Sequence, residues 1–259
     1  MDAELSGTTA ISASFHGNMI SVCNVGDSRV ILGHRVKDTN SGENVVAIPL
    51  SRDQTPYRKD ERERVKRLGA AVMSIDQIEG LEPIHENFGD LVLGKDVDYH
   101  GDPPRVWVEG KNYPGCAFTR SLGDGLAESI GVTAEPEMIC RDLTVNDEVL
   151  ILASDGIFEF LTNQEVIDMS QSCGDPLKAC QCLVEASYNQ WLTYERRTDD
   201  ITIIVCYLKC TKPVPQEGVE GTTEDLVGLA KSAYGTKPIR RSRGKNDTLC
   251  VEPSIKSTA

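Results

Sequence analysis

Apolar and polar residues alternate in short segments through the first fifty residues. Thr8 to Phe15 alternates small and apolar residues, and Met19 to Val25 repeats the pattern after a His-Gly-Asn turn. This arrangement predicts a β-hairpin. Two further β-branched segments, Val30 to Leu32 and Val45 to Leu50, predict two more strands. We therefore expect the first fifty residues to form an antiparallel meander.

Helical signals follow in other parts of the chain. Thr162 begins a Thr-Asn-Gln-Glu capping box, and Asp175-Pro176 places an acceptor and a proline where a second helix should begin. Apolar residues recur at helical intervals after both caps, so both helices should pack on a sheet. The charged segment Tyr57 to Leu68 predicts a solvated helix with acid-base pairs. Ser74 to Pro104 shows no persistent period and predicts a long loop.

The apolar segment Val149 to Leu152 predicts a strand that is buried on both faces. It ends at Ser154-Asp155-Gly156, and a carboxylate there should lie at the rim of the core, because burying it without a partner is costly. Glu159 follows four residues later, so a helical turn would place both carboxylates on one face. Such like charges repel unless a proton or a cation lies between them. An ordinary solvated turn is the alternative interpretation.

Other carboxylates also stand at strand ends. Asp27 lies in a Gly-Asp-Ser-Arg turn, and Asp199-Asp200 precedes the β-branched segment Ile201 to Cys206. Each fits a turn when taken alone, but a sheet can bring them to one edge together with Asp155 and Glu159. Carboxylates with few histidines and no suitably spaced cysteines select Mg²⁺ or Mn²⁺, ions that act on phosphate oxygens. The residues therefore predict a metal-dependent hydrolase of a phosphate ester.

Composition narrows the partners and the compartment. The net charge of -13 argues against nucleic acid, whose phosphates bind Lys and Arg, and favours cations. No apolar segment approaches the roughly 18 residues of a membrane span, and the first residues do not resemble a signal peptide. Nine cysteines without a regular framework indicate a reducing compartment, the cytosol or nucleus. We expect a monomer with one domain, residues 1–210, and a disordered tail, residues 211–259.

Six short motifs occur in a fixed order along residues 6–208. They are Ser-Gly-Thr-Thr-Ala from Ser6, Val-Gly-Asp-Ser-Arg from Val25, Leu-Ser-Arg-Asp-Gln-Thr-Pro from Leu50, Thr-Arg-Ser-Leu-Gly-Asp from Thr119, Ala-Ser-Asp-Gly-Ile-Phe-Glu from Ala153 and Asp-Asp-Ile-Thr from Asp199. This series resembles the type 2C metal-dependent protein serine/threonine phosphatases, also called the PPM family. Arg-Val-Trp-Val from Arg105 and the Pro114-Gly115 pair resemble its plant members.

The resemblance implies a fold, a reaction and site residues. The fold would be an α+β αββα sandwich, in which two antiparallel sheets face each other between outer helices. Asp155 and Asp199 match the catalytic ligands of a Mg²⁺ or Mn²⁺ pair, while Asp27 and Glu159 match ligands of a further ion. In that mechanism a metal-activated water hydrolyses phosphoserine or phosphothreonine in protein substrates, without a covalent phosphoenzyme.

The resemblance also has a gap. The family pattern begins upstream of Ser6, with a phosphate-binding Arg and an Asp-Gly-His-Gly-Gly motif that this sequence lacks. We therefore expect an N-terminally incomplete domain, from a truncated gene model, an alternative start or a fragment, in which the inner metal pair is weakened. Two alternatives follow. One is a catalytically impaired pseudophosphatase or regulatory binding module, and the other is a metal hydrolase of another phosphate ester.

Overall fold

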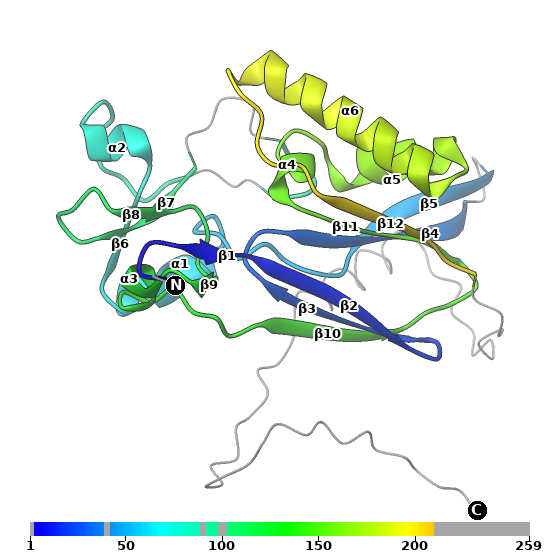
Figure 1. The fold of residues 1–259 in the computed structure, drawn as a ribbon, viewed down its shortest axis with the longest axis horizontal. Coiled ribbons are helices and arrows are strands. Elements are labelled where there is room, and N and C mark those ends of the chain that lie inside the picture. Colours follow the sequence, from blue (N-terminus) through cyan, green and yellow to red (C-terminus); the bar gives the residue numbers. More distant parts are fainter. Residues whose placement is uncertain (1–2, 39–41, 89–91, 98–102, 210–259) are drawn as a thin grey trace, which may run out of the picture.

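Two antiparallel β-sheets face each other in the computed structural model, which describes residues 3–38, 42–88, 92–97 and 103–209 (Figure 1). The larger sheet has the order β12-β11-β4-β5 and the smaller has the order β10-β3-β2. The larger sheet contains β4 (Arg29–Asp38), β5 (Gly42–Pro49), β11 (Asp147–Ala153) and β12 (Ile203–Tyr207). The smaller contains β2 (Ala10–His16), β3 (Met19–Val25) and β10 (Glu137–Asp142).

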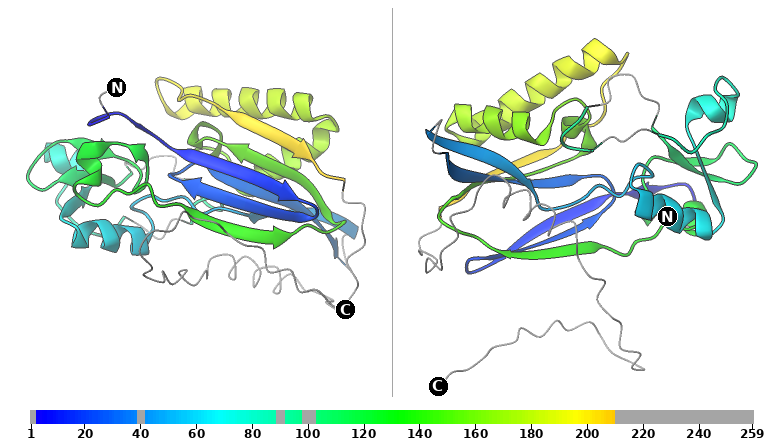
Figure 2. Two further views of the ribbon diagram at one scale, coloured as in Figure 1. Left: turned by 60° about the horizontal axis from the view of Figure 1, so that its bottom comes forward. Right: turned by 180° about the vertical axis from the view of Figure 1, so that it is seen from behind.

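Helices α5 (Asn163–Cys173) and α6 (Pro176–Tyr194) cover the outer face of the larger sheet, and the view from behind shows the same layers (Figure 2). Their predicted caps are present. The Thr162 hydroxyl accepts a hydrogen bond from the Glu165 amide at 3.3 Å, and Asp175 accepts one from the Lys178 amide at 3.0 Å. Both helix predictions are confirmed. The two capping side chains stabilise the helix starts, because they accept hydrogen bonds from amides that have no partner within the first turn.

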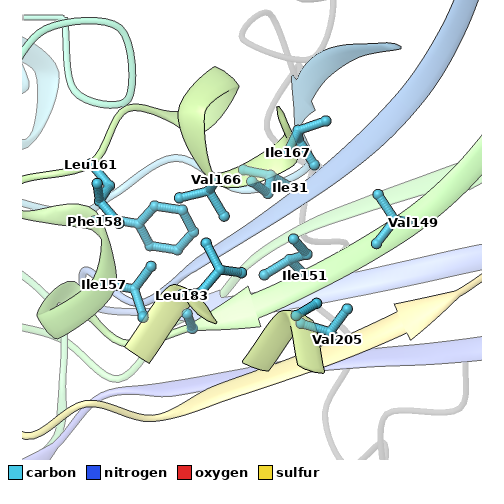
Figure 3. Close-up of a cluster of buried hydrophobic side chains, with 12 residues drawn as sticks. Ile31, Val149, Ile151, Ile157, Phe158, Leu161, Val166, Ile167, Leu183 and Val205 are labelled. Atoms are coloured by element: carbon cyan, nitrogen blue, oxygen red, sulfur yellow. The ribbon is translucent and has the colours of Figure 1, made fainter. Parts of the chain in front are cut away.

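The central strand is buried on both faces, as predicted. Val149 and Ile151 of β11 lie against the helices, as Figure 3 shows, whereas Leu150 faces the smaller sheet. Successive side chains of a strand point to opposite faces, so one strand contributes to two cores. The first core lies between the larger sheet and the helices, and the second lies between the two sheets.

A smaller layer lies at one end of the sandwich (Figure 1). It contains a sheet of order β6-β7-β8, a short β1-β9 pair and three helices. Two of the helices, α1 and α3, share an apolar cluster with the three-stranded sheet. Its strands are β1 (Gly7–Thr8), β6 (Ala70–Met73), β7 (Arg105–Val108), β8 (Pro114–Cys116) and β9 (Leu122–Gly123). Its helices are α1 (Lys59–Arg67), α2 (Ile75–Glu79) and α3 (Gly125–Glu128).

The expected meander over the first fifty residues is wrong. β2 pairs with β3 and β4 pairs with β5, but these two hairpins belong to different sheets. Val30 and Leu32 of β4 pack face to face with Ile20 and Val22 of β3 in the core between the sheets. Alternation of apolar residues is the same for neighbours within one sheet and for partners across two sheets, so the pattern could not separate the two cases.

The long loop predicted between Ser74 and Pro104 contains a helix. Ser74 and Gln77 form a reciprocal capping box at the start of α2, with the Gln77 amide donating to the Ser74 hydroxyl at 3.1 Å. A Ser-x-x-Gln sequence was therefore available as a signal. The helix has only five residues, so it was too short to show a periodic apolar pattern.

The predicted fold class, two stacked antiparallel sheets with helices outside, is confirmed. Within the described ranges the helix layer covers the larger sheet, and no helix lies over the outer face of β10-β3-β2 (Figure 2). No helix among the described residues is both long and apolar enough to cross a membrane. The predicted tail, residues 211–259, lies outside the described residues.

Candidate functional site

Three strand ends meet at one edge of the larger sheet. β4 begins at Arg29, opposite Ala153 at the end of β11, and Ala153 in turn lies opposite Ile203 at the start of β12. Asp27 lies just before β4, Asp155 just after β11 and Asp199 just before β12. The register therefore gathers the three predicted acidic segments at the same edge, although they are far apart in the sequence.

Their carboxylates interact electrostatically. Burial, followed by the neighbouring charges of Asp155, Asp53 and Glu159, raises the pKa of Asp27 to about 8. Burial and then the charge of Asp199 raise the pKa of Asp155 to about 6. Each raised pKa means that a further negative charge is unfavourable there, so the site would be stabilised by positive charge.

The turn after β11 is helical, as predicted. α4 (Asp155–Phe158) begins at Asp155, and the Glu159 amide donates to the Asp155 carbonyl at 2.8 Å. Both carboxylates therefore belong to one helical turn. After burial and the charges of Asp155 and Asp53, the charge of Glu159 also raises the pKa of Asp27, so Glu159 belongs to the same electrostatic environment.

Ser154 joins the Asp155 turn to the Asp199 segment. Its hydroxyl donates to the Asp200 carbonyl at 3.0 Å and accepts from the Thr202 amide at 3.1 Å. A Cβ atom on Gly156 would lie 2.5 Å from the same Asp200 carbonyl oxygen. Glycine is therefore required at 156 because the two acidic segments pack backbone to backbone.

The acidic residues do not form a closed metal cage. Among the residues that the structure describes, no group of three or more His, Cys, Asp or Glu side chains is arranged to hold a metal ion. The carboxylates still fit a hard divalent cation by ligand type and charge, because Mg²⁺ and Mn²⁺ take oxygen ligands and keep several waters. The roles of Asp27, Asp155, Glu159 and Asp199 as metal ligands remain predictions.

Sequence reasoning gave no role to Asp53, which lies in the Leu-Ser-Arg-Asp motif. Both of its carboxylate oxygens accept hydrogen bonds from the Arg29 guanidinium, at 3.0 and 2.6 Å. Arg29 also donates to Asn163 at 2.8 Å and stacks 4.5 Å from the centre of the Phe158 ring. This buried pair ties the start of β4 to α4 and α5. Arg29 and its three partners come from segments that are distant in sequence, so no spacing in the sequence indicated the Arg29–Asp53 pair.

The segment Ser6–Thr9 links two of the motifs. The Thr9 hydroxyl lies 3.0 Å from the Ser28 hydroxyl, and a Cβ atom on Gly26 would lie 2.4 Å from the Thr9 side chain. β1 pairs with β9, with Gly7 opposite Gly123. The Ser-Gly-Thr-Thr motif therefore holds the Asp27 turn against the Thr119–Asp124 segment.

Helix α1 anchors the same segment through a buried carboxylate. Glu61 accepts hydrogen bonds from Arg64 at 2.7 Å, from Arg120 at 2.8 Å and from the Thr119 hydroxyl at 2.6 Å. Burial alone would raise the pKa of Glu61, but the bonds from Arg120 and Arg64 outweigh it and hold the pKa well below its usual range. The predicted exposed helix with acid-base pairs is therefore wrong at Glu61, whose carboxylate is buried, whereas the buried Val65 is one of the few apolar anchors that the prediction allowed.

The fold and the site together define the class of protein: an antiparallel β-sandwich whose acidic side chains gather at one edge of a sheet. The chain belongs to the protein phosphatase 2C family, whose model matches residues 2–192. It is 50% identical over 210 residues to "Probable protein phosphatase 2C 35" of Arabidopsis thaliana, covering 81% of this chain and 58% of the relative. It is 32% identical over 210 residues to "Probable protein phosphatase 2C 64" of Oryza sativa subsp. japonica, covering 80% and 43%. The predicted family and its plant character are confirmed.

Solved structures show the same fold. A serine-threonine phosphatase 2C from Toxoplasma gondii aligns with a TM-score of 0.59 at 20% identity, covering 78% of this chain and 58% of that one. A C. elegans sex determining protein aligns with a TM-score of 0.52 at 16% identity, covering 86% and 43%. The chain spans little more than half the length of the Arabidopsis relative.

Proposed function

We propose that the protein is a protein serine/threonine phosphatase that hydrolyses phosphoserine and phosphothreonine in a Mg²⁺- or Mn²⁺-dependent reaction. The observation that carries the proposal is the convergence of Asp27, Asp155 and Asp199 at one sheet edge, in a chain of the protein phosphatase 2C family. Convergence matters because a hard divalent cation takes several oxygen ligands at once, and here the carboxylates that could supply them come from three separate segments.

Charge supports the choice of cation. Burial of the carboxylates at this edge, and then their mutual repulsion, raise the pKa values of Asp27 and Asp155. A divalent cation would replace that repulsion with attraction and release any proton held there, since carboxylates bind metals in their ionised form. Asp155 and Asp199 would hold the catalytic ions, and Asp27 with Glu159 would hold a further ion.

Bound Mg²⁺ or Mn²⁺ would supply Lewis acidity toward phosphoryl oxygens and an activated water for in-line hydrolysis. The chain contributes the positions of the ligands. Ser154 fixes the Asp199 segment against the Asp155 turn, and the Arg29–Asp53 pair fixes the start of β4 against α4. Both sets of contacts keep the carboxylates at the edge before any ion arrives, which lowers the cost of assembling the site.

Asp155→Asn is the test. The purified 259-residue chain is assayed with a phosphothreonine peptide over a range of Mn²⁺ concentrations. Asn keeps the size of the side chain but loses its charge, so turnover should fall by more than about 100-fold, beyond the effect of an outer-shell partner. Asp142→Asn, which removes an exposed carboxylate on β10, should leave turnover unchanged.

Other results would favour the alternatives, which nothing in the fold or the comparisons supports. Mn²⁺-independent binding of the phosphopeptide without turnover by the wild-type chain would indicate a non-catalytic binding module. Turnover of a small phosphate ester but not of the phosphopeptide would indicate a hydrolase of another substrate class. Turnover that is insensitive to Asp155→Asn would show that the proposed site is wrong.

The proposal extends to the surroundings of the enzyme. Its partners would be phosphoserine and phosphothreonine proteins, and nucleic acid is not expected. We propose the cytosol or nucleus as its compartment, where thiols stay reduced; the seven described cysteines are all free thiols. We also expect a monomer, with residues 1–210 as one domain.

A further inference from the structure

The carbonyl of Gly156, the residue after Asp155, accepts hydrogen bonds from two side chains of α6. The Trp191 indole donates to it at 2.8 Å, and the Ser187 hydroxyl donates to the same oxygen. Ser187 is 1% exposed, so water cannot readily replace its bond. A helix that packs on the sheet thus contacts the backbone of the acidic turn directly.

Gly156 is held on its other sides as well. Its amide donates to the Asp155 carboxylate at 2.9 Å, and its Cα faces the Asp200 carbonyl so closely that a Cβ would lie 2.5 Å away. The hydrogen bond from the Gly156 amide orients the carboxylate of Asp155. The hydrogen bonds to the Gly156 carbonyl hold Gly156 to α6. A shift of the Gly156 carbonyl would therefore turn the Asp155 side chain.

The same helix leads to the second acidic segment. α6 ends at Tyr194, and residues 195–198 connect it to Asp199. Leu183 anchors the helix in the core, and Trp191 packs edge to face on Phe160 with ring centres 4.9 Å apart. The position of α6 is thus fixed relative to the sheet. Through Gly156 and residues 195–198, the position of α6 affects the positions of the Asp155 and Asp199 carboxylates.

We propose that Ser187 and Trp191 are positioning residues that fix Asp155 relative to Asp199 and so set the affinity of this edge for a divalent cation. The identity of the ligand as Mg²⁺ or Mn²⁺ rests on the proposed function. Neither side chain touches the ion or the substrate in this assignment. They act through the Gly156 backbone, as outer partners that orient a metal ligand do.

The test measures binding of Mn²⁺ alone to the full chain, from the electron paramagnetic resonance signal of the free ion. Trp191→Phe keeps an aromatic ring against Phe160 but loses the indole donor, and Ser187→Ala loses the hydroxyl. Each should weaken Mn²⁺ binding by about tenfold, the effect typical of an outer partner of a metal ligand. Ser187→Thr keeps a donor and should restore the affinity.

Matched controls lose the same chemical group elsewhere. Trp107→Phe removes an indole that donates to the Met73 carbonyl, also at 2.8 Å, and Thr193→Ala removes an α6 hydroxyl that donates to the Asn189 carbonyl at 2.7 Å. Both should bind Mn²⁺ like the wild type. Turnover of a phosphopeptide by Trp191→Phe should return toward the wild-type rate at saturating Mn²⁺, because the ligands themselves remain.

The contrary outcomes are distinct. If Trp191→Phe and Ser187→Ala bind Mn²⁺ as the controls do, the positioning role is wrong, while loss of Mn²⁺ binding in Asp155→Asn would still support the proposed function. If the wild type and Asp155→Asn bind Mn²⁺ equally, the proposed metal site is wrong and the positioning role falls with it. If circular dichroism shows both α6 variants unfolded without metal, the two bonds serve the fold and the proposal is overturned.

Discussion

Asp124 has a left-handed backbone, with φ 52° and ψ 49°, although it is not a glycine. The left-handed region costs roughly 1–2 kcal/mol for a residue with a Cβ, least for Asp and Asn. Asp124 is only 8% exposed, and its amide donates to the Ser6 carbonyl at 2.8 Å, which holds it against β1. Its carboxylate fills the space above Gly7, where a Cβ would lie 1.9 Å from Oδ2.

This contact makes Gly7→Ala destabilising. The new methyl group must displace the Asp124 carboxylate, and overpacking of this kind costs about 1–3 kcal/mol. Asp124→Gly removes both the carboxylate and the left-handed penalty, so in that background Gly7→Ala should lose most of its cost. Urea unfolding of the single and double variants measures the coupling.

The control is Gly125→Ala, whose Cβ would meet its nearest atom at 3.4 Å, an ordinary contact distance. It should change the free energy of unfolding less than Gly7→Ala does. An equal cost of Gly7→Ala with and without Asp124 would show that the packing of the Ser-Gly-Thr-Thr segment has another origin.

At the scale of elements, α1 shows how a charged helix can be anchored by one buried acid. Glu61 is 2% exposed, and its partners lie on α1 itself and in the Thr119–Arg120 segment. Burying a carboxylate is tolerated here because two guanidinium groups compensate its charge. The helix therefore connects the smaller layer to the motif that β1 also contacts.

Glu61→Gln should destabilise the protein by about 1.5–3 kcal/mol near neutral pH, since hydrogen bonds to a charged group are lost. The pKa of Glu61 is depressed in the folded state, so its contribution is complete above the unfolded pKa of about 4.3 and is lost as the pH falls below that value. The difference in the free energy of unfolding between the wild type and Glu61→Gln should therefore become smaller as the pH falls.

Urea unfolding from about pH 7 down to about pH 3 tests this dependence. Glu63→Gln is the matched control on α1, because Glu63 is exposed and forms a long ion pair with Lys59 at 3.9 Å. Its effect should be within about 0.5 kcal/mol, as for most surface changes. If the difference in the free energy of unfolding between the wild type and Glu61→Gln did not change with pH, Glu61 would not be ionised in the folded protein as assigned.

Capping signals explain why some elements were predictable. Thr162 and Asp175 each satisfy an amide of their own helix, so the residues that define α5 and α6 lie within a few positions of each other. Glu61 is different, because its partners Thr119 and Arg120 are distant in sequence. Charge pattern alone cannot tell a solvated acid from one that meets arginines across the fold.

For the whole molecule, stability depends on two cores that share the larger sheet. Leu150 of β11 is fully buried between the two sheets, with Val30, Leu32 and Ile20 in the same cluster. Leu150→Ala should therefore cost about 2–5 kcal/mol, the range for buried leucines that leave a cavity. Thermal or urea unfolding measures it.

Leu177→Ala is the control for this change, because Leu177 of α6 is 66% exposed and its truncation leaves no buried cavity. Its effect should stay within about 0.5 kcal/mol. If Leu150→Ala were equally mild, the two sheets would not form a continuous core in solution.

Local signals determined much of this protein. The strand Val149–Leu152, the helical turn that aligns Asp155 with Glu159 and the caps at Thr162 and Asp175 depend on residues close together in sequence. The ordered motifs also determined the family, because residues required at fixed places in the chain can be recognised without coordinates.

Only the tertiary structure decided which strands pair and what holds the acidic edge. It assigned the first two hairpins to separate sheets, joined Arg29 to Asp53, and placed Ser187 and Trp191 on the Gly156 carbonyl. These contacts join residues that are tens of positions apart. Their geometry depends on how sheets and helices pack, and a one-dimensional pattern of apolar and polar residues does not contain that information.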